Sequence, residues 1–220
     1  LDVYGEVMDA LDVARSSGLA ADQPTWAVQR VIMDYLEGHW ADPDNGLWEM
    51  RGDRQQFTHS KVMTWVGVDR AIRGIEEWHL DGPLDRWKAL RAQIHADVLE
   101  HGYDADLNTF VQAYGSRDLD AALLLVPAVG FLPGEDPRVI GTIEAIQRDL
   151  QAGGFVRRYL TEDTTGVDGL RGEEATFLVC TFWLAECLAH QRRRKEAREA
   201  FQRACRCAND LGLFAEAIQP

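Results

Sequence analysis

The chain has 220 residues, of which 46% are hydrophobic and 27% charged, and this composition fits a folded globular protein of one domain or two small ones. Aspartate and glutamate outnumber lysine and arginine by 36 to 23, so the formal net charge is −13, which argues against a nucleic-acid or anionic-membrane partner. No apolar run approaches the roughly 20 residues of a membrane-spanning helix.

The first residues, Leu1 to Tyr4, include no initiator methionine, basic segment or apolar segment. We therefore expect no signal peptide, and we expect the chain to be a piece of something longer. The cysteines form no CxxC pair, and no histidine lies at a zinc-ligand spacing from them. They are expected to be buried free thiols of a cytoplasmic protein without a bound metal: Cys180, Cys187, Cys205 and Cys207.

Apolar residues at helical spacing fill the first hundred positions. The spacing predicts a helix over 3–17 that ends at Gly18, a second from Pro24 to Gly38, a third beginning with Thr58 as N-cap, and a fourth from Pro83 to Gly102. Residues 41–56 are predicted to be a loop, because they contain the turn sequence Asp-Pro-Asp-Asn-Gly.

The second half of the chain is also mostly helical in pattern, after an irregular connection around Phe110 and Tyr114. Helices are predicted over 118–129, 136–153, 174–190 and 192–211, the last ending at Gly212, with a loop over 156–168 that contains a short strand. About eight helices alternate between buried and amphipathic, which fits a closed α/α toroid or an open solenoid. The unequal loops disfavour a regular repeat.

The first loop rich in functional side chains reads Gly-Leu-Trp-Glu-Met-Arg from Gly46. A carboxyl beside a large aromatic side chain, as in Trp48-Glu49, can have a raised pKa that suits a general acid, and Arg51 can pair with a carboxylate or a substrate hydroxyl. The alternative is structural: Trp48 fills the core and Glu49 pairs with Arg51 at the surface.

Polar groups at the start of the third helix follow directly, and His59 and Lys61 are expected to stand near the Trp48-Glu49 loop. The alternative is a helix cap with a solvated Lys61. A second polar loop contains Arg158 and Tyr159, and then Glu173, which the helix dipole alone can explain. Glu216 lies in a last segment too short to form a helix, where the alternative is a solvated terminal carboxylate.

Taken in order, these loops resemble the inverting glucoamylases and bacterial trehalases of glycoside hydrolase family 15. The resemblance runs along essentially the whole chain and is carried by five strings, which begin at Asp2, Gly46, Phe57, Gly172 and Asn209. It implies an all-α (α/α)6 barrel, incomplete in this chain, with the active site in the loops at one end. Residues 1–220 would then form a single catalytic-barrel domain that lacks the family's N-terminal β-sandwich and first barrel helices.

The resemblance also implies roles for individual residues. Glu49 matches the general acid and Glu216 the general base, while Arg158 and Tyr159 match a substrate-binding pair. Glu173 falls in a loop that contacts sugar hydroxyls, and His59 and Lys61 lie beside the site. An inverting pair of carboxyls stands about 6.5–9.5 Å apart to admit water, and Trp48 and Tyr4 can stack on sugar rings. The mechanism requires no cofactor.

Two features of the sequence leave alternatives open. Ala217 and Gln219 replace acidic residues that usually follow the base, which would allow an inactive family member kept as a scaffold. The alanine-rich segment 195–204 looks like a helical-repeat binding module, although no 34-residue period accompanies it. We expect a disaccharide or oligosaccharide substrate, weak or no activity in these residues alone, and an apolar seam that favours a homo-oligomer.

Overall fold

The structure is a computed structural model, and it describes residues 1–19, 22–160 and 176–219. Eight α-helices lie in this part of the chain, as the apolar spacing predicts. The residues fall into two units, one made of 1–49 with 54–101 and the other of 50–53 with 102–220.

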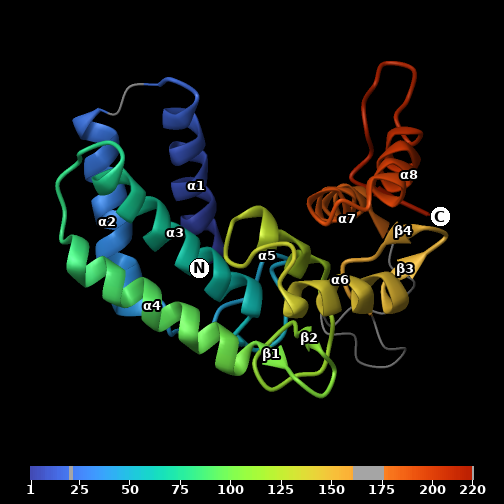
Figure 1. The fold of residues 1–220 in the computed structure, drawn as a ribbon, viewed down its shortest axis with the longest axis horizontal. Coiled ribbons are helices and arrows are strands. Elements are labelled where there is room, and N and C mark those ends of the chain that lie inside the picture. The colour runs from blue at the N-terminus through green and yellow to red at the C-terminus, as the bar shows by residue number, and fades with distance from the viewer. Residues whose placement is uncertain (20–21, 161–175, 220) are drawn as a thin grey trace. The chain divides into compact units, whose positions relative to one another are not determined.

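The first unit consists of four helices: α1 (Asp2–Ser16), α2 (Gln23–His39), α3 (Thr58–Glu76) and α4 (Leu84–His101). Helix α3 packs against the other three and is buried along nearly all of its length (Figure 1). Apolar side chains of α1, α2 and α4 cover it, among them Met8, Leu36 and Ile94, none of which has exposed surface. Because α3 begins directly after the polar loop 41–56, the packing of α3 in this core fixes the position of the last residues of the loop.

Helix starts in this unit are partly as predicted. Pro24 lies in the first turn of α2, and Asp22 caps that helix by accepting a hydrogen bond from the backbone N–H of Thr25 at 2.8 Å. The prediction that Thr58 caps α3 is wrong. Phe57 occupies the cap position in an extended conformation, and the Thr58 hydroxyl is buried without a hydrogen-bond partner.

Partly buried ion pairs connect α1, α3 and α4. The Arg70 guanidinium of α3 contacts Asp9 of α1 at 2.7 Å and Asp69 at 2.6 Å, and Asp69 also receives Arg91 of α4 at 2.6 Å. Asp12 is buried and pairs with Arg73 at 2.7 Å, while burial raises the pKa of its carboxyl. The polar residues of α3 are therefore compatible with a central helix, because oppositely charged groups compensate them.

Helices α1 and α3 pack closely against each other at Gly5. A Cβ atom at this position would lie 2.0 Å from the backbone oxygen of Met63, a distance that no packed structure tolerates. We expect Gly5→Ala to lower the free energy of unfolding by roughly 3 kcal/mol, because the backbone of one helix must move. Denaturant unfolding of the protein that carries this chain measures the change.

The matched control for this substitution is Gly38→Ala. Gly38 is exposed in α2 and would place its Cβ in open space. Alanine should there stabilise the protein by about 0.5–1 kcal/mol through helix propensity. Equal effects of the two substitutions would contradict the close helix crossing.

The second unit contains shorter elements: β1 (Tyr103–Asp104), β2 (Thr109–Phe110), the 3₁₀ helix η1 (Ala121–Leu124), α5 (Leu125–Ala128), α6 (Pro137–Asp149), β3 (Gln151–Ala152), β4 (Phe155–Val156), β5 (Thr176–Phe177), α7 (Leu178–His190), α8 (Arg194–Cys205) and β6 (Ala217–Ile218). The strands form three antiparallel pairs, β1–β2, β3–β4 and β5–β6. Helices α7 and α8 lie side by side, with the β3–β4 hairpin near α8 (Figure 1).

All four helices predicted in this unit are shorter than expected. Helix α6 ends at Asp149, where the chain enters the β3–β4 hairpin, and α7 begins only at Leu178, after the strand β5. Residues 118–120 are not helical, because the Asp118 carbonyl accepts a hydrogen bond from Gln112, and Asp120 caps a short 3₁₀ turn instead. Helix α8 ends at Cys205, six residues before Leu211. The Asn209 side chain accepts hydrogen bonds from the backbone N–H groups of Leu211 and Leu213, so a turn replaces the last helical residues.

The cysteines are free thiols, as predicted, although only Cys180 and Cys187 are buried and the other two are half-buried. Burial raises the pKa of both inner thiols, that of Cys187 to about 12, so these two are poor nucleophiles. Among the described residues, no helix is long and apolar enough to cross a membrane. The same residues contain no cluster of three or more His, Cys, Asp or Glu side chains suited to a metal ion.

Candidate active site

The Trp48-Glu49 loop is closed at its base by a short antiparallel bridge in the first unit. Asp44 and Gln55 exchange two backbone hydrogen bonds of 2.9 Å each. Inside the bridge, Gly46 has a positive φ of 68° and packs against the Phe57 ring, and a Cβ at Gly46 would lie 3.0 Å from that ring. The glycine is therefore required by both its conformation and its contact. The predicted loop over 41–56 is confirmed.

Glu49 lies at the tip of this turn, and its side chain is exposed. Its backbone N–H donates to the Gly46 carbonyl at 3.1 Å, and its φ is 50°, in the left-handed region that non-glycine residues rarely adopt. Holding a glutamate there costs about 1–3 kcal/mol. A conformation of this kind is more common at functional sites than elsewhere, because the surrounding structure must compensate for the strain.

A hollow of about 340 Å³ lies beside the start of this loop, within the first unit. Tyr4 of α1 and Tyr35 of α2 form one wall, with ring centroids 5.0 Å apart. Asp44 and Arg54 contribute charged groups, and the remaining lining residues come from the start of α1 and from 42–46. Aromatic faces beside carboxylate and guanidinium groups are the usual components of a sugar-binding surface.

Lys61 holds the first part of the loop in place. Its ammonium group donates to the backbone carbonyls of Trp40 at 2.7 Å and Asp42 at 2.6 Å. The alternative of a solvated lysine is wrong, because the residue is only 1% exposed. Burial lowers the pKa of the amine to about 8, against the opposing attraction of nearby aspartates. Lys61 therefore fixes the backbone at the start of the loop from the buried side of the loop.

His59 is also buried, two residues before Lys61 on α3. Neither ring nitrogen has a hydrogen-bond partner in the protein, and the adjacent Ser60 hydroxyl has none either. Burial lowers the pKa of the imidazole to about 4, although the Asp2 and Asp44 carboxylates favour its protonated form. The histidine is consequently neutral at physiological pH, with two ring nitrogens that can still exchange hydrogen bonds.

This low pKa predicts a loss of stability in acid. The unfolded chain takes up a proton on His59 near pH 6.5, whereas the folded protein does so only near pH 4, so stability falls as the pH drops through that interval. We expect His59→Phe to remove a loss of about 3 kcal/mol between pH 7 and pH 4. Urea unfolding at several pH values measures it.

The exposed Val31 of α2 provides the control. Val31→Phe removes no titratable group and should leave the pH dependence of unfolding as in the unmodified protein. If the unfolding free energy of His59→Phe falls between pH 7 and pH 4 by as much as that of the unmodified protein, the buried neutral state of His59 is refuted.

Arg158 and Tyr159 lie together in the second unit. The Tyr159 side chain is buried, and the Arg158 guanidinium lies over its ring at 5.2 Å and over the Phe177 ring at 4.2 Å. Two aromatic faces thus orient the guanidinium. The Arg158 carbonyl accepts a hydrogen bond of 2.7 Å from Ala121, which fixes this segment against the start of η1.

Glu216 is held beside the same aromatic ring by a backbone ladder. Its carbonyl accepts a hydrogen bond of 3.0 Å from Leu178, and the next residue, Ala217, pairs with Phe177. The side chain is exposed, and the residue lies in an irregular stretch directly before the two-residue strand β6, so the segment is not a helix, as its short length predicts. Arg158 and Glu216 therefore both lie at the β5–β6 pair.

The remaining predicted site residues are placed as follows. Trp48 is half-buried in the first unit, and Arg51 is exposed in the short stretch that belongs to the second. Glu173 lies outside the described residues. Tyr35, Asp44 and Arg54 line the hollow but were not predicted from the sequence. Asp44 could have been found, since it belongs to the turn sequence that precedes Trp48.

The chain shows extensive sequence similarity to known proteins. The sequence profile described as glycosyl hydrolases family 15 matches residues 1–213. A trehalase of Thermoplasma volcanium is 38% identical over 218 residues, 99% of this chain and 34% of that protein. A trehalase of Mycobacterium tuberculosis is 39% identical over 219 residues, 100% of this chain and 32% of that protein. The chain spans about a third of the length of these curated relatives.

Solved structures with similar folds are glycosidases. A glycosidase variant in complex with glucose has a TM-score of 0.83 at 20% identity and covers 99% of this chain and 56% of its own. Glucoamylase from Saccharomycopsis fibuligera has a TM-score of 0.58 at 13% identity, over 74% of this chain and 39% of its own. These likenesses concern the fold, and with the helix-rich structure they confirm the predicted all-α class of the toroid type.

Proposed function

The chain belongs to glycosyl hydrolase family 15, and on that premise we propose that the protein carrying it hydrolyses the glucosidic bond of trehalose. The observation that carries this proposal is the identity of 38–39% to trehalases over essentially every residue of the chain. The polar hollow beside the Trp48-Glu49 turn supports it, since its aromatic and charged lining suits a sugar.

In the proposed mechanism, Glu49 donates a proton to the glycosidic oxygen. Glu216 accepts a proton from a water molecule that attacks the anomeric carbon from the opposite face, so that the configuration inverts. Support comes from the two backbones: a left-handed turn presents the exposed Glu49 side chain, and a strand pair presents that of Glu216. The step needs no cofactor or metal.

The other polar residues are proposed to bind the sugar. Tyr4 and Trp48 stack on the rings, and Arg158, already oriented by Tyr159 and Phe177, donates to hydroxyl groups. Arg51 and Glu173 are proposed to contact hydroxyls from their own loops. His59 and Lys61 act beneath the site, where Lys61 fixes the loop and His59 supplies a neutral imidazole.

We also propose that residues 1–220 form part of one catalytic barrel, completed by helices elsewhere in the protein. The chain's share of its relatives, about a third, is consistent with this. It follows that activity belongs to the whole protein, and that these residues alone hydrolyse sugars weakly or not at all.

Glucose release by the whole protein tests the proposed function. We expect faster turnover of trehalose than of maltose, and NMR should detect one β-glucose and one α-glucose as the first products from each trehalose. Two α-glucose molecules would indicate retention and would exclude the acid–base pair. Failure to hydrolyse either sugar would favour the alternatives, a scaffold or a helical-repeat binding module.

A further inference from the structure

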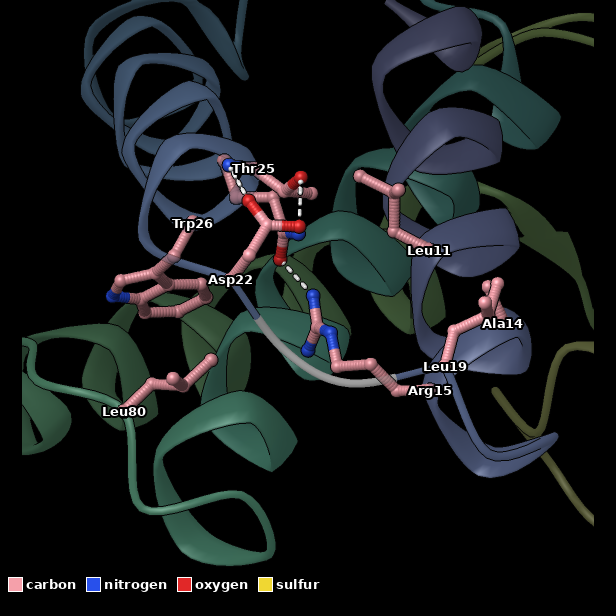
Figure 2. A pocket seen from close by; sticks show the side chains of 9 residues that line it. Leu11, Ala14, Arg15, Leu19, Asp22, Thr25, Trp26 and Leu80 are labelled. Atoms are coloured by element: carbon pink, nitrogen blue, oxygen red, sulfur yellow. Dashed lines mark hydrogen bonds between the residues drawn. The ribbon is translucent and has the colours of Figure 1, made fainter.

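A small pocket of about 170 Å³ lies between α1 and α2, at the end of α1 opposite to Tyr4 (Figure 2). Arg15 lies eleven positions after Tyr4 on this helix, which corresponds to roughly 16 Å along the axis. Four apolar side chains form most of the wall, together with the Trp26 ring. They are Leu11, Ala14, Leu19 and Leu80.

The Arg15 guanidinium is a buried cation in this pocket, only 5% exposed. Its Nη2 donates to the Gln29 side-chain oxygen, and its carbon lies 5.9 Å from the Trp26 ring centroid. Its Nη1 has no hydrogen-bond partner, and within the described residues no carboxylate lies within 4.0 Å. Burial lowers the pKa of the guanidinium, but an arginine remains charged.

Gln29 adds a second donor. The residue is 1% exposed, and because its oxygen accepts the bond from Arg15, its Nε2 must present the two N–H groups. That nitrogen also has no partner in the protein. Figure 2 shows the Arg15 side chain reaching across from α1 toward α2, where Asp22 and Thr25 bond to each other.

Two buried donors without acceptors beside an apolar wall define the ligand by its chemistry. We propose that this pocket binds a small aliphatic monocarboxylate, with its oxygens on Arg15 and Gln29 and its tail against Leu11, Leu80 and Trp26. A carboxylate supplies the two planar acceptors that the two donors lack, and a negative charge closer to the Arg15 guanidinium than that of Asp12, which acts on it only from a distance. The volume is far below the roughly 300–1,000 Å³ of pockets for drug-sized ligands, so the tail must be short.

A single negative charge suits this site better than two. Asp22 lies on the rim, and Asp12, one turn before Arg15 on α1, is buried nearby. Both carboxylates repel additional negative charge, as does the net charge of −13. The walls are also rigid, since the Trp26 indole donates to the Asp81 carbonyl at 3.0 Å.

Titration with sodium acetate, propionate and butyrate tests the proposal, at constant ionic strength set with chloride. The protein that carries this chain should show a saturable rise in unfolding temperature with a carboxylate, as ligand linkage requires. Arg15→Met should weaken binding by about tenfold to a hundredfold, since a charge-assisted hydrogen bond is lost. The exposed Arg30, which pairs with Asp81, gives the control Arg30→Met, expected to bind as the unmodified protein does.

A second variant keeps the test decisive if Arg15→Met does not fold. Ala14→Leu retains the cation but fills the pocket, so it should abolish carboxylate binding. If the carboxylates raise the unfolding temperature no more than chloride does, the proposal is overturned. It is also overturned if they raise the unfolding temperature of the Ala14→Leu variant. Inorganic phosphate that stabilises the protein more than any monocarboxylate would overturn the ligand class. Because the readout is unfolding and not hydrolysis, the result is independent of the proposed catalytic function.

Discussion

Replacing Glu49 by glutamine is expected to lower kcat for trehalose hydrolysis by roughly a hundredfold to ten-thousandfold, the usual contribution of a general acid. The amide cannot donate the proton that the departing sugar oxygen needs. Glu49 is exposed at the tip of its turn, so glutamine should fit without loss of folding. Initial rates of glucose release, with the unfolding temperature measured in parallel, separate a chemical effect from a structural one.

Substrates with different leaving groups test whether Glu49 acts as the proton donor. An α-glucoside whose leaving group is a weakly basic phenol needs no protonation, and Glu49→Gln should cleave it almost as fast as the unmodified protein does. Glu100→Gln, in the exposed part of α4, should leave both substrates unaffected. If Glu49→Gln were equally slow on both substrates, Glu49 would not be the proton donor.

Glu216→Gln is expected to produce a loss of similar size by a different route. Without the carboxylate, nothing accepts the proton of the attacking water, and kcat should fall by roughly a hundredfold to ten-thousandfold for every substrate, activated or not. The backbone hydrogen bond from Leu178 to the Glu216 carbonyl does not involve the side chain, so the strand pair should persist.

A small anionic nucleophile distinguishes a base from a group that only binds sugar. Azide attacks without losing a proton, so it should restore part of the turnover of Glu216→Gln and none of that of Glu49→Gln on trehalose. The exposed Asp210, six residues earlier, gives the control Asp210→Asn, which should retain full activity. Near-normal turnover in Glu216→Gln without azide would refute the assignment.

Helix positions were largely predictable because the signals for them are local. Pro24 and Pro137 lie in the first turns of α2 and α6, each preceded by a capping aspartate. Errors arose where a distant partner competes for a backbone or side-chain group. The backbone N–H of Gln112 donates a hydrogen bond to the Asp118 carbonyl, which removes that carbonyl from a helix. The Lys61 ammonium group donates to the carbonyls of Trp40 and Asp42 and is buried as a result. Such partners leave no periodic trace in the sequence.

The candidate site was predictable only as a set of loops. The strings that begin at Gly46 and Asn209 identified the segments of Glu49 and Glu216, and the second polar loop identified that of Arg158, but spacing alone equally allowed surface positions for each. The left-handed conformation of Glu49 has no sequence signal, since glycine is the residue that normally indicates it. Tyr35 was missed because an exposed aromatic on a helix is common and marks no function by itself.

The β5–β6 pairing affects the order in which structure and activity return during refolding. Only two residues on each side make this pairing, and about forty residues of chain, including α7 and α8, lie between them. Closing so long a loop for so few contacts is entropically unfavourable until the two helices have docked. During refolding, ellipticity should therefore return before Glu216 reaches its position, and recovery of turnover should lag behind.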